Sequence, residues 1–479
     1  MISSTEMAVV DANAEALGVP RKQLMESSGN AIARVVREHA DVGASIALVC
    51  GRGNNGGDAF VAARFLDEYE VAVHLLGRPE TITTGIAREN WDALRRSDTV
   101  TYRVGDSNEI DIGSPDIIVD AMLGTGIKGA LREPEATAAA AINAAEATVL
   151  AVDVPSGIDA DTGGRDGIAV GADHVVTFHD AKPGLRGIDA AVTVADIGIP
   201  DAAERYVDRG DLLRISRNPT AHKGDFGRVL VVGGGPYTGA PALSAQAALR
   251  SGADLAYVAC PETVADEIQS YSEDLILEPQ PGSRIDTADV PELLDLAADV
   301  DCVVFGPGIG DGEATLDAVS AFFGDFDGIA VVDADALQVV PDIDTEATLV
   351  CTPHQGELEA MGGKTAEEPA RRAELVTEFA AELDATLLVK GAVDVISNGE
   401  RTRRNRSGNP GMTVGGTGDV LAGITGAMAC TLDPIHAAAL GAYANGTAGD
   451  IVAEEYGYGL VATDLLEAVP AALWPDRTT

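Results

Sequence analysis

Short apolar segments alternate with longer amphipathic segments along the whole chain, and this alternation predicts a succession of β-strands and α-helices. In the first half the apolar segments are rich in β-branched residues and end at Gly, Asp or Pro, as central strands of a parallel sheet do. The strands expected there are Ile46–Cys50, Val71–Leu76, Ile117–Asp120, Thr148–Asp153 and His174–Phe178, with helices between them that include Ala59–Tyr69 and Glu135–Ala145. The pattern predicts an open, doubly wound α/β sheet whose ligands bind at the carboxyl ends of the strands.

The same pattern begins again after Ser216–Pro219 and predicts a second α/β domain. Its expected strands are Arg228–Val232, Leu255–Ala259, Cys302–Phe305, Ile329–Asp333, Leu349–Cys351 and Leu387–Lys390. The segment Val393–Ser397 follows the last of these closely enough to pair with it as a hairpin. Since no sequence repeat links the halves, we expect two unlike α/β domains, residues 1–213 and 214–479, that join near Leu213.

The charge of the chain is strongly one-sided, with 76 acidic against 33 basic residues and a formal net charge of -43. Repulsion among so many like charges destabilises a compact state in dilute buffer, whereas salt screens it beyond roughly 10 Å at 0.1 M. We therefore expect a halophilic protein of a saline cytoplasm. A surface that binds nucleic acid or an anionic membrane would show basic patches, so neither partner is expected.

The cysteines are widely separated, and several lie in apolar, strand-like segments: Cys50, Cys260, Cys302, Cys351 and Cys430. Because they form no CxxC pair, they indicate buried free thiols and neither a disulfide framework nor a zinc site. The N-terminal sequence lacks the basic, apolar and cleavage-site succession of a signal peptide. No apolar run approaches the roughly 18 residues of a membrane-spanning helix. These features predict a soluble, cytoplasmic protein.

A glycine-rich segment, GRGNNGGDAF from Gly51 to Phe60, follows the first expected strand directly. Glycines let backbone amides approach a phosphate, and a helix that begins at Asp58–Ala59 would attract an anion to its N-terminus. The spacing fits neither the dinucleotide fingerprint GxGxxG nor the phosphate-binding loop GxxxxGK[ST]. Two consecutive carboxamides offer oxygens to a monovalent cation or to a sugar. A tight strand-to-helix turn without a ligand accounts for the glycines equally well.

Two further strand ends bring polar side chains to the same edge of the predicted sheet. The sequence IIVDAMLGTGIKG places Asp120 at the end of one strand, ahead of a second glycine loop, Gly124–Gly129. The sequence VLAVDVPSGIDADTG places Asp153 and Ser156 at the end of the next. Either acid alone fits a helix cap or a turn. Three such strand ends in one domain favour a binding crevice.

Together these motifs resemble the NAD(P)H-hydrate epimerase family, and DANAEALGVPRKQLMESSG near the start and VTFHDAKPGL near Thr177 extend the resemblance over residues 1–213. The resemblance implies a Rossmann-like epimerase domain in which Asp153 lies close to the reacting carbon of hydrated NADH or NADPH. It implies that the same substrate contacts Asn54, Asn55, Gly56, Gly57, Asp58, Gly124, Thr125, Gly126, Ile127, Lys128, Gly129 and Ala130. It also implies a potassium ion held by Asn55, Asp120 and Ser156, whose oxygens suit such a hard cation. Some proteins of related fold serve as RNA-decapping scaffolds, but Asp120 and Asp153 favour the catalytic form.

The second domain opens with a strand and a glycine-rich turn, AHKGDFGRVLVVGGG, followed by TGAPALSAQAALRSGA. Polar strand ends follow in VVFGPGIG at Val303–Gly310, VVDADAL at Val331–Leu337 and TPHQGELEAM at Thr352–Met361. Taken alone, these turns are as typical of a structural role as of ligand binding. His354 fits a capping or core histidine as well as a binding residue.

The stretch NPGMTVGGTGDVLAGITGAM, from Asn409 to Met428, carries the clearest chemical signal of this domain. Glycines that lead into an apolar helix present successive N–H donors and the positive end of the helix to developing negative charge. Asp419 lies at the start of that helix, where its carboxylate can take a proton from a substrate hydroxyl. The alternative is an aspartate that only caps the helix.

With LLVKGAVDVI at Leu387–Ile396, this stretch resembles the ribokinase-like fold, and the full set of motifs resembles its NAD(P)H-hydrate dehydratase branch over about Arg214 to Thr479. The resemblance implies that an adenosine nucleotide contacts Lys390, Gly391, Ala392, Val393, Asp394 and Gly418. It implies that the hydrated cofactor contacts Gly239, Ala240, Gly308, His354 and Asp419, with Asp419 as the base. It favours ADP, used with Mg²⁺, over ATP as the phosphoryl donor.

The two resemblances imply consecutive steps on one substrate, because hydration of NADH or NADPH gives two epimers and such a dehydratase accepts only the S epimer. We therefore expect a bifunctional isomerase and lyase that acts on small molecules and forms a homo-oligomer. A vitamin or sugar kinase is the alternative for the second domain, and a scaffold without activity is the alternative for the whole chain. A Rossmann dehydrogenase is not expected, because neither half has GxGxxG with an acidic residue about 20 positions on.

Overall fold

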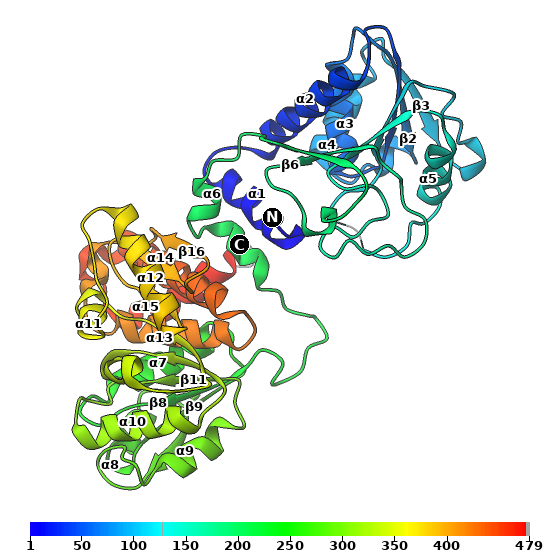
Figure 1. Ribbon diagram of the computed structural model, residues 1–479. Helices are drawn as coiled ribbons and strands as arrows, with labels where there is room; N and C mark the ends of the chain where they lie inside the picture. Colours follow the sequence, from blue (N-terminus) through cyan, green and yellow to red (C-terminus); the bar gives the residue numbers. More distant parts are fainter. Residues whose placement is uncertain (127, 476–479) are drawn as a thin grey trace. The chain divides into compact units, whose positions relative to one another are not determined.

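The computed structural model describes residues 1–126 and 128–475, which divide into two compact units, Met1–Ala203 and Glu204–Thr479 (Figure 1). The division lies before the domain boundary expected near Leu213. The reason is that the segment after Ala203 hydrogen-bonds to the strand Thr402–Asn405 of the second unit. Within the described residues, no helix is long and apolar enough to cross a membrane.

The first unit is built on a seven-stranded parallel sheet with the order β3-β2-β1-β4-β5-β6-β7. Its strands are β1 Ser45–Cys50, β2 Glu70–Leu76, β3 Val100–Val104, β4 Ile117–Ala121, β5 Thr148–Val152, β6 His174–Phe178 and β7 Ala191–Ala195. The strand order reverses between β1 and β4. Loops after neighbouring strands diverge at such a point and leave a crevice at the carboxyl ends of the strands. The predicted doubly wound parallel sheet is confirmed.

Helices cover both faces of this sheet, because alternate residues of each strand point to opposite faces. The helices are α1 Ser4–Ala16, α2 Arg21–His39, α3 Asn54–Arg64, α4 Gly85–Leu94 and α5 Glu135–Ala144, and the short α6 Ala202–Arg205 lies at the division between the units. Apolar residues of α1 to α4 share one core with Leu48 of β1. Apolar residues of α5 share another core with the adjacent Val49.

Helix α3 begins earlier than the sequence pattern predicts. We expected its N-terminus at Asp58–Ala59, but the first helical residue is Asn54 and Gly53 is the cap. Gly56 belongs to the first turn and packs so closely on Gly51 that a Cβ there would overlap the Gly51 carbonyl. The prediction was wrong because glycines usually interrupt a helix, whereas here close packing requires one. Asp58 consequently lies in the second turn and is only 9% exposed.

The second unit is built on a nine-stranded sheet with the order β10-β9-β8-β11-β12-β13-β14-β15-β16. Its strands are β8 Arg228–Val232, β9 Leu255–Pro261, β10 Ile276–Gln280, β11 Cys302–Phe305, β12 Ile329–Val332, β13 Thr348–Cys351, β14 Thr386–Val389, β15 Asp394–Ser397 and β16 Thr402–Asn405. Neighbours are parallel from β10 to β14 and antiparallel from β14 to β16. The hairpin predicted for Val393–Ser397 is therefore confirmed.

Two helical layers enclose this sheet. The helices are α7 Gly239–Arg250, α8 Glu262–Gln269, α9 Val290–Ala297, α10 Glu313–Asp325, α11 Gln355–Ala360, α12 Pro369–Leu383, α13 Thr417–Ala429, α14 Pro434–Tyr456 and α15 Ala462–Leu473. Apolar residues of α7, α8, α13, α14 and α15 form the core on one face, and those of α9 to α12 form the core on the other. All five cysteines are free thiols and four of them are buried, as predicted.

A buried ion pair joins the segment after Ala203 to the last strand of the second unit. The guanidinium of Arg403 on β16 donates to both carboxylate oxygens of Asp211 at 3.1 and 3.0 Å, and to the carbonyl of Tyr206 at 2.8 Å. The backbone amide of Val207 donates to the carbonyl of Arg404 at 2.9 Å. These bonds place residues up to Arg214 in the second unit, ahead of the expected boundary.

We expect Asp211→Ala to destabilise the second unit by about 3–5 kcal/mol, because it leaves the buried Arg403 guanidinium without its carboxylate. Urea unfolding in high-salt buffer measures the change. Glu467→Ala is the control, since it removes an ion pair with Arg250 whose side chains are 74% and 48% exposed. That loss should cost at most about 1 kcal/mol. Equal losses in the two variants would contradict the role assigned to the Asp211 pair.

Candidate active sites

A cavity of about 560 Å³ opens at the carboxyl ends of the central strands in the first unit. Its walls come from the loops after β1, β4, β5 and β6 and from helices α1 and α2. Of the residues that the sequence suggested, it is lined by Asn54, Asn55, Asp58, Gly124, Thr125, Gly126 and Asp153. The structure thus brings all three sequence motifs of this domain to one cavity.

Asp153 is held in an unusual backbone conformation by several interactions. Its φ is 66°, in the left-handed region that few residues other than glycine adopt. The Lys182 ammonium lies 3.1 Å from Oδ1 of Asp153, and the Thr177 hydroxyl donates to the same oxygen at 3.1 Å. The Lys182 side chain is fully buried and also donates to the carbonyls of Phe178 and Asp180 at 2.8 and 3.2 Å. The carboxylate is therefore fixed in place and its charge is compensated.

Besides Asp153, the cavity is lined by Asp11, Asp58 and Glu135, and two of these acids, Asp58 and Asp11, have raised pKa values. Burial raises the pKa of Asp58 well above its ordinary value, and the negative charges of Asp153 and Asp11 raise it further. Burial likewise raises the pKa of Asp11 to about 6, although Arg21 and Lys182 partly oppose this. An acid with such a pKa can give and take protons near neutrality. Asp11 and Lys182 were not predicted as site residues, although both lie in segments that the resemblance included.

The predicted potassium ligands lie beside this cavity. The Ser156 hydroxyl and amide donate to Asp120 at 2.7 and 2.8 Å, and the carboxylate is completely buried. Burial raises the pKa of Asp120 to about 6, and the three hydrogen bonds that oppose this rise come from uncharged donors on Ser156 and Met122. The side-chain nitrogen of Asn55 is buried without a hydrogen-bond partner, and its side chain lies against Gly124. The Asp120 carboxylate, the Ser156 hydroxyl and the Asn55 carboxamide oxygen are ligands of the kind that an oxygen-binding monovalent cation requires, whereas the unpartnered Asn55 nitrogen is a hydrogen-bond donor and binds no cation.

The other residues predicted for the first site are placed differently. Gly56 and Gly57 are buried within α3, where they serve close packing. Gly129 lines a smaller cavity of about 140 Å³, and Ala130 is exposed. The Lys128 side chain is 74% exposed and lies 3.7 Å from Asp161. Ile127 falls outside the described residues.

In the second unit, the polar centre is an ion pair at the ends of β12 and β14. The Lys390 ammonium lies 3.1 Å from Oδ1 of Asp333 and 3.6 Å from Oε2 of Glu357. The Thr352 hydroxyl donates to the same Asp333 oxygen at 2.7 Å. A Cβ on Gly418 would lie 3.5 Å from the Lys390 ammonium, an ordinary contact distance, so the lysine lies beside the start of α13. Lys390 and Gly418, both predicted to contact a nucleotide, are therefore neighbours.

Asp419 lies in the first turn of α13, as predicted. Burial raises its pKa to about 7, and the charge of Asp333 adds to this effect while Lys390 opposes it. The Ser244 hydroxyl of α7 donates to the backbone carbonyl of Asp419 at 2.8 Å. A carboxyl group that titrates near neutrality is suited to act as a general base.

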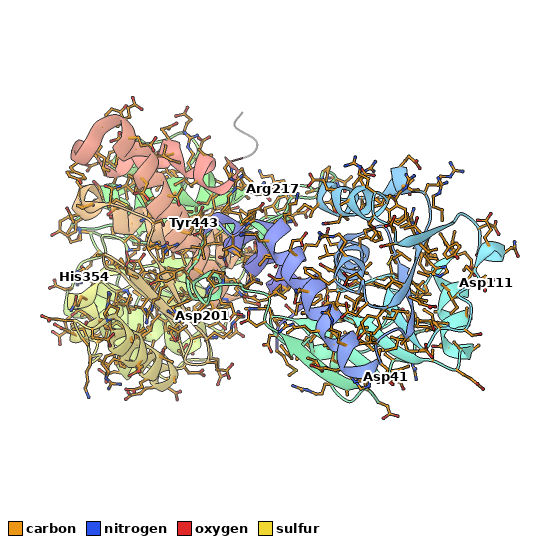
Figure 2. The ribbon with its side chains drawn as sticks, turned by 90° about the horizontal axis from the view of Figure 1, so that it is seen from above. Asp41, Asp111, Asp201, Arg217, His354 and Tyr443 are labelled. Atoms are coloured by element: carbon orange, nitrogen blue, oxygen red, sulfur yellow. The ribbon has the colours of Figure 1, made fainter. Side chains whose placement is uncertain are left out.

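His354 takes the capping role that the sequence left open, and its ring also remains accessible. It caps α11, where its Nδ1 accepts from the Glu357 amide at 3.0 Å, while the Glu357 carboxylate accepts from the His354 amide. Its side chain, labelled in Figure 2, belongs to the second unit and is 60% exposed. Through Glu357, this histidine is connected to Lys390 at the centre of the site. A capping role thus coexists with a position from which the ring can meet a ligand.

The remaining predicted residues of the second site form two groups. Gly308 has a φ of 69°, and a Cβ there would overlap Tyr237 and lie 3.2 Å from Ala240, so the turn before α7 meets the loop after β11. The loop Lys390–Asp394 is closed by the Gly391 amide, which donates to Asp394 at 2.9 Å. Arg372, which the sequence did not suggest, donates to the carbonyls of Val393 and Lys390 at 3.0 and 3.2 Å.

Two family models match this chain. The one described as YjeF-related protein N-terminus matches residues 21–184, and the one described as NAD(P)H-hydrate dehydratase matches residues 229–471. Bifunctional NAD(P)H-hydrate repair enzymes of Methanothermobacter thermautotrophicus and Archaeoglobus fulgidus are 43% and 42% identical to it. These alignments cover 99% and 98% of this chain and 96% and 98% of those proteins. The chain belongs to this family.

The ribokinase-like fold has support from a solved structure as well. A ribokinase-like superfamily protein of Enterococcus faecalis V583 is 24% identical, with a TM-score of 0.50, and the match covers 57% of this chain and 95% of that one. The fold class and the family of bifunctional NAD(P)H-hydrate repair enzymes, both expected from the motifs, are confirmed.

The raised pKa of Asp419 predicts that the second unit becomes less stable as the pH rises and this carboxyl group ionises. An unfolded aspartate titrates near 3.9, so the folded chain holds an extra proton between about pH 4 and pH 7 and loses stability as the pH rises through that range. Asparagine cannot ionise. We therefore expect Asp419→Asn to raise the free energy of unfolding at pH 8 by about 1–3 kcal/mol and to leave it unchanged near pH 4.

Denaturant unfolding at a series of pH values measures this difference. Glu467→Gln, at a side chain that is 74% exposed, is the matched control and should show no such pH-dependent gain. If Asp419→Asn changed the free energy of unfolding by the same amount at every pH, burial would not destabilise the ionised form of this carboxyl group.

Proposed function

We propose that this protein repairs hydrated NADH and NADPH. Its first unit interconverts the R and S epimers, and its second unit returns the S epimer to NAD(P)H at the expense of ADP, with release of AMP and phosphate. One observation carries the proposal. The family resemblance assigns chemistry to Asp153 and Asp419: Asp153 forms an ion pair with Lys182 at a strand end of the first unit, and Asp419 lies beside the Lys390–Asp333 ion pair of the second.

In the second unit, Asp419 removes the proton of the hydroxyl on the hydrated ring carbon, and the resulting oxygen attacks the terminal phosphorus of ADP. The bond from that phosphorus to AMP breaks, so hydroxide, a poor leaving group, is replaced by phosphate. The lone pair of the ring nitrogen then expels phosphate, and loss of a proton from the neighbouring ring carbon restores the dihydronicotinamide. A base whose pKa lies near the working pH suits the first step.

The other residues of the second unit bind and orient the two substrates. Lys390–Asp394 and Gly418 hold the adenosine nucleotide, and Mg²⁺ bound with it neutralises phosphate charge. Amides at the start of α13, which Gly416 caps, donate to the phosphoryl oxygens. Gly239, Ala240, Gly308 and His354 hold the hydrated cofactor. Because Lys390 lies 3.1 Å from Asp333 and next to Gly418, its charge is fixed before the nucleotide arrives.

In the first unit, Asn54, Asn55, Asp58 and the loop Gly124–Ala130 bind the dinucleotide, while Asp153 lies next to the carbon that is inverted. Potassium binds to Asn55, Asp120 and Ser156. The completely buried carboxylate of Asp120 supports this assignment. The ion would fix the glycine loop, because the Leu123 amide donates to Ser156 at 3.1 Å.

A single assay tests both activities. Purified protein in high-potassium buffer with Mg²⁺ and ADP is mixed with both epimers of hydrated NADH, and the return of reduced-nicotinamide absorbance is followed, with ATP and no nucleotide as controls. Complete recovery of both epimers, with AMP and phosphate released, is expected. Recovery that stops when one epimer is exhausted would contradict the epimerase role. A stable phosphorylated product would favour the vitamin or sugar kinase.

Asp419→Asn should lower dehydration by at least about 100-fold, because the base is lost, and should leave epimerisation nearly intact. The two rates are measured separately, with absorbance for dehydration and chromatographic separation of the epimers for epimerisation. Asp433→Asn, at a side chain that is 85% exposed, is the matched control. Near-normal dehydration by Asp419→Asn would overturn the assignment of this base.

Asn55→Ala and Asp120→Asn should weaken the dependence of epimerisation on potassium, because each removes a ligand oxygen or its charge. Epimerisation rates over a potassium titration, at constant ionic strength maintained with a bulky organic cation, measure the effect. Dehydration by the second unit is the control. If the half-saturating potassium concentration were unchanged in both variants, the ion would have to bind elsewhere.

A further inference from the structure

Helix α1 contributes an acid to the first site to which the family resemblance assigns no role. Asp11 stands in the DANAEALG stretch, ahead of residue 21, where the first family match begins. Together with Met7 of the same helix, it lines the cavity of about 560 Å³ that also holds Asp153 and Asp58. A carboxyl group in that wall can touch the bound substrate.

The placement of Asp11 is fixed by the packing of α1 against the rest of the unit. Ser3 caps the helix, and the Ser4 hydroxyl donates to Asp161 at 2.7 Å. Near the other end of the helix, the side chain of Asn13 donates to the carbonyl of Ala203 at 3.0 Å. Val9 and Val10 are buried directly before Asp11. A helix held at both ends presents its acid to the cavity in a defined position.

Charged groups face Asp11 from each element around it. They are Arg21 of α2, Asp58 of α3, Asp153 after β5, and His179 and Lys182 after β6. Burial is the largest cause of its raised pKa, followed by the opposing effects of Arg21 and Lys182. Lys182 is already 3.1 Å from Asp153. One carboxylate of the cavity thus has a close cationic partner, whereas Asp11 is left able to carry a proton.

We propose that Asp11 is a catalytic residue of epimerisation, the acid that gives a proton to the hydroxyl of the hydrated ring and takes it back. This inference rests on the proposed epimerase function of the first unit. Inversion of the hydroxyl-bearing carbon requires that one of its bonds break and form again on the other face, and a cavity lined by a proton donor favours the carbon–oxygen bond.

The step balances without any co-reactant other than water. The Asp11 proton passes to the hydroxyl oxygen, the carbon–oxygen bond breaks, and the ring nitrogen lone pair forms a carbon–nitrogen double bond as water leaves. Water then adds to the opposite face, its electron pair forms the new carbon–oxygen bond, and its proton returns to the Asp11 carboxylate. Asp153, paired with Lys182, stabilises the positive charge of the ring between these two events.

Asp11→Asn should lower kcat for epimerisation by about 100-fold, the usual contribution of a positioned acid, with KM changed less than about threefold. The wild-type kcat should fall as the pH rises through about 6, where the acid loses its proton, and the variant should lack this limb. Asp11→Glu, which keeps the carboxyl, should recover part of the rate. Glu38→Gln, at an exposed position of the neighbouring helix α2, should retain the wild-type rate.

Three outcomes would overturn the proposal. A near-normal kcat of Asp11→Asn, or a loss that appears only as a higher KM together with a lower unfolding temperature, would reduce Asp11 to a structural residue. A second test is epimerisation in ¹⁸O-labelled water. If the enzyme epimerised the hydrate but the label entered it no faster than without enzyme, the route through the broken carbon–oxygen bond would be excluded. If the wild type itself failed to epimerise the hydrate, the proposed epimerase function would fail. That outcome is distinguishable from a failure of the Asp11 proposal, because it requires no variant.

Discussion

An ion pair between a lysine and an aspartate at a strand end underlies each of the two sites. In the first unit Lys182 pairs with Asp153, and in the second Lys390 pairs with Asp333, each at 3.1 Å. Parallel strands direct their carboxyl ends to one edge, so polar side chains gather there and lose their water. A buried carboxylate is stable only when a charge or several hydrogen bonds compensate it. The chain has only six lysines among 479 residues, and two of them lie at these strand ends. Their position indicates that each buried carboxylate requires a positive charge beside it.

The same pairs separate the acids of each site into two kinds. One carboxylate has a lysine within 3.1 Å, while a neighbouring carboxyl group is left with a raised pKa: Asp11 and Asp58 in the first unit, Asp419 in the second. When their environments give two neighbouring carboxyl groups different pKa values, one can act as an acid and the other as a base at the same pH. The negative charge of Asp153 and Asp333 also contributes directly to the shifts, since each raises the pKa of its neighbours. The same aspartate thus has its own charge balanced by a lysine and raises the pKa of the carboxyl group beside it.

The strands that the sequence predicted correctly and those that it missed differ in their place in the sheet. The predicted strands are central and buried on both faces, so they appear as continuous apolar runs. The four that were missed, β3, β7, β10 and β16, are the two edges of each sheet. Three residues of β3 and four of β7 are exposed, and β16 reads TRRN. An edge strand has a neighbour on one side only and tolerates polar residues, so hydrophobic pattern cannot distinguish it from a loop.

A similar division applies to the site residues. Those carried by glycine-rich motifs after a strand, such as Asp153 and Asp419, could be predicted because the motif and the topology both point to the same edge. Asp11, Glu357 and Arg372 were not singled out, because each reaches its site through tertiary packing that a local motif does not show. For Asp11 the decisive fact is that α1 is fixed at both ends against the first unit, and no local pattern encodes that. Sequence motifs therefore identify the strand ends at which polar side chains gather, whereas packing determines which acids there acquire raised pKa values.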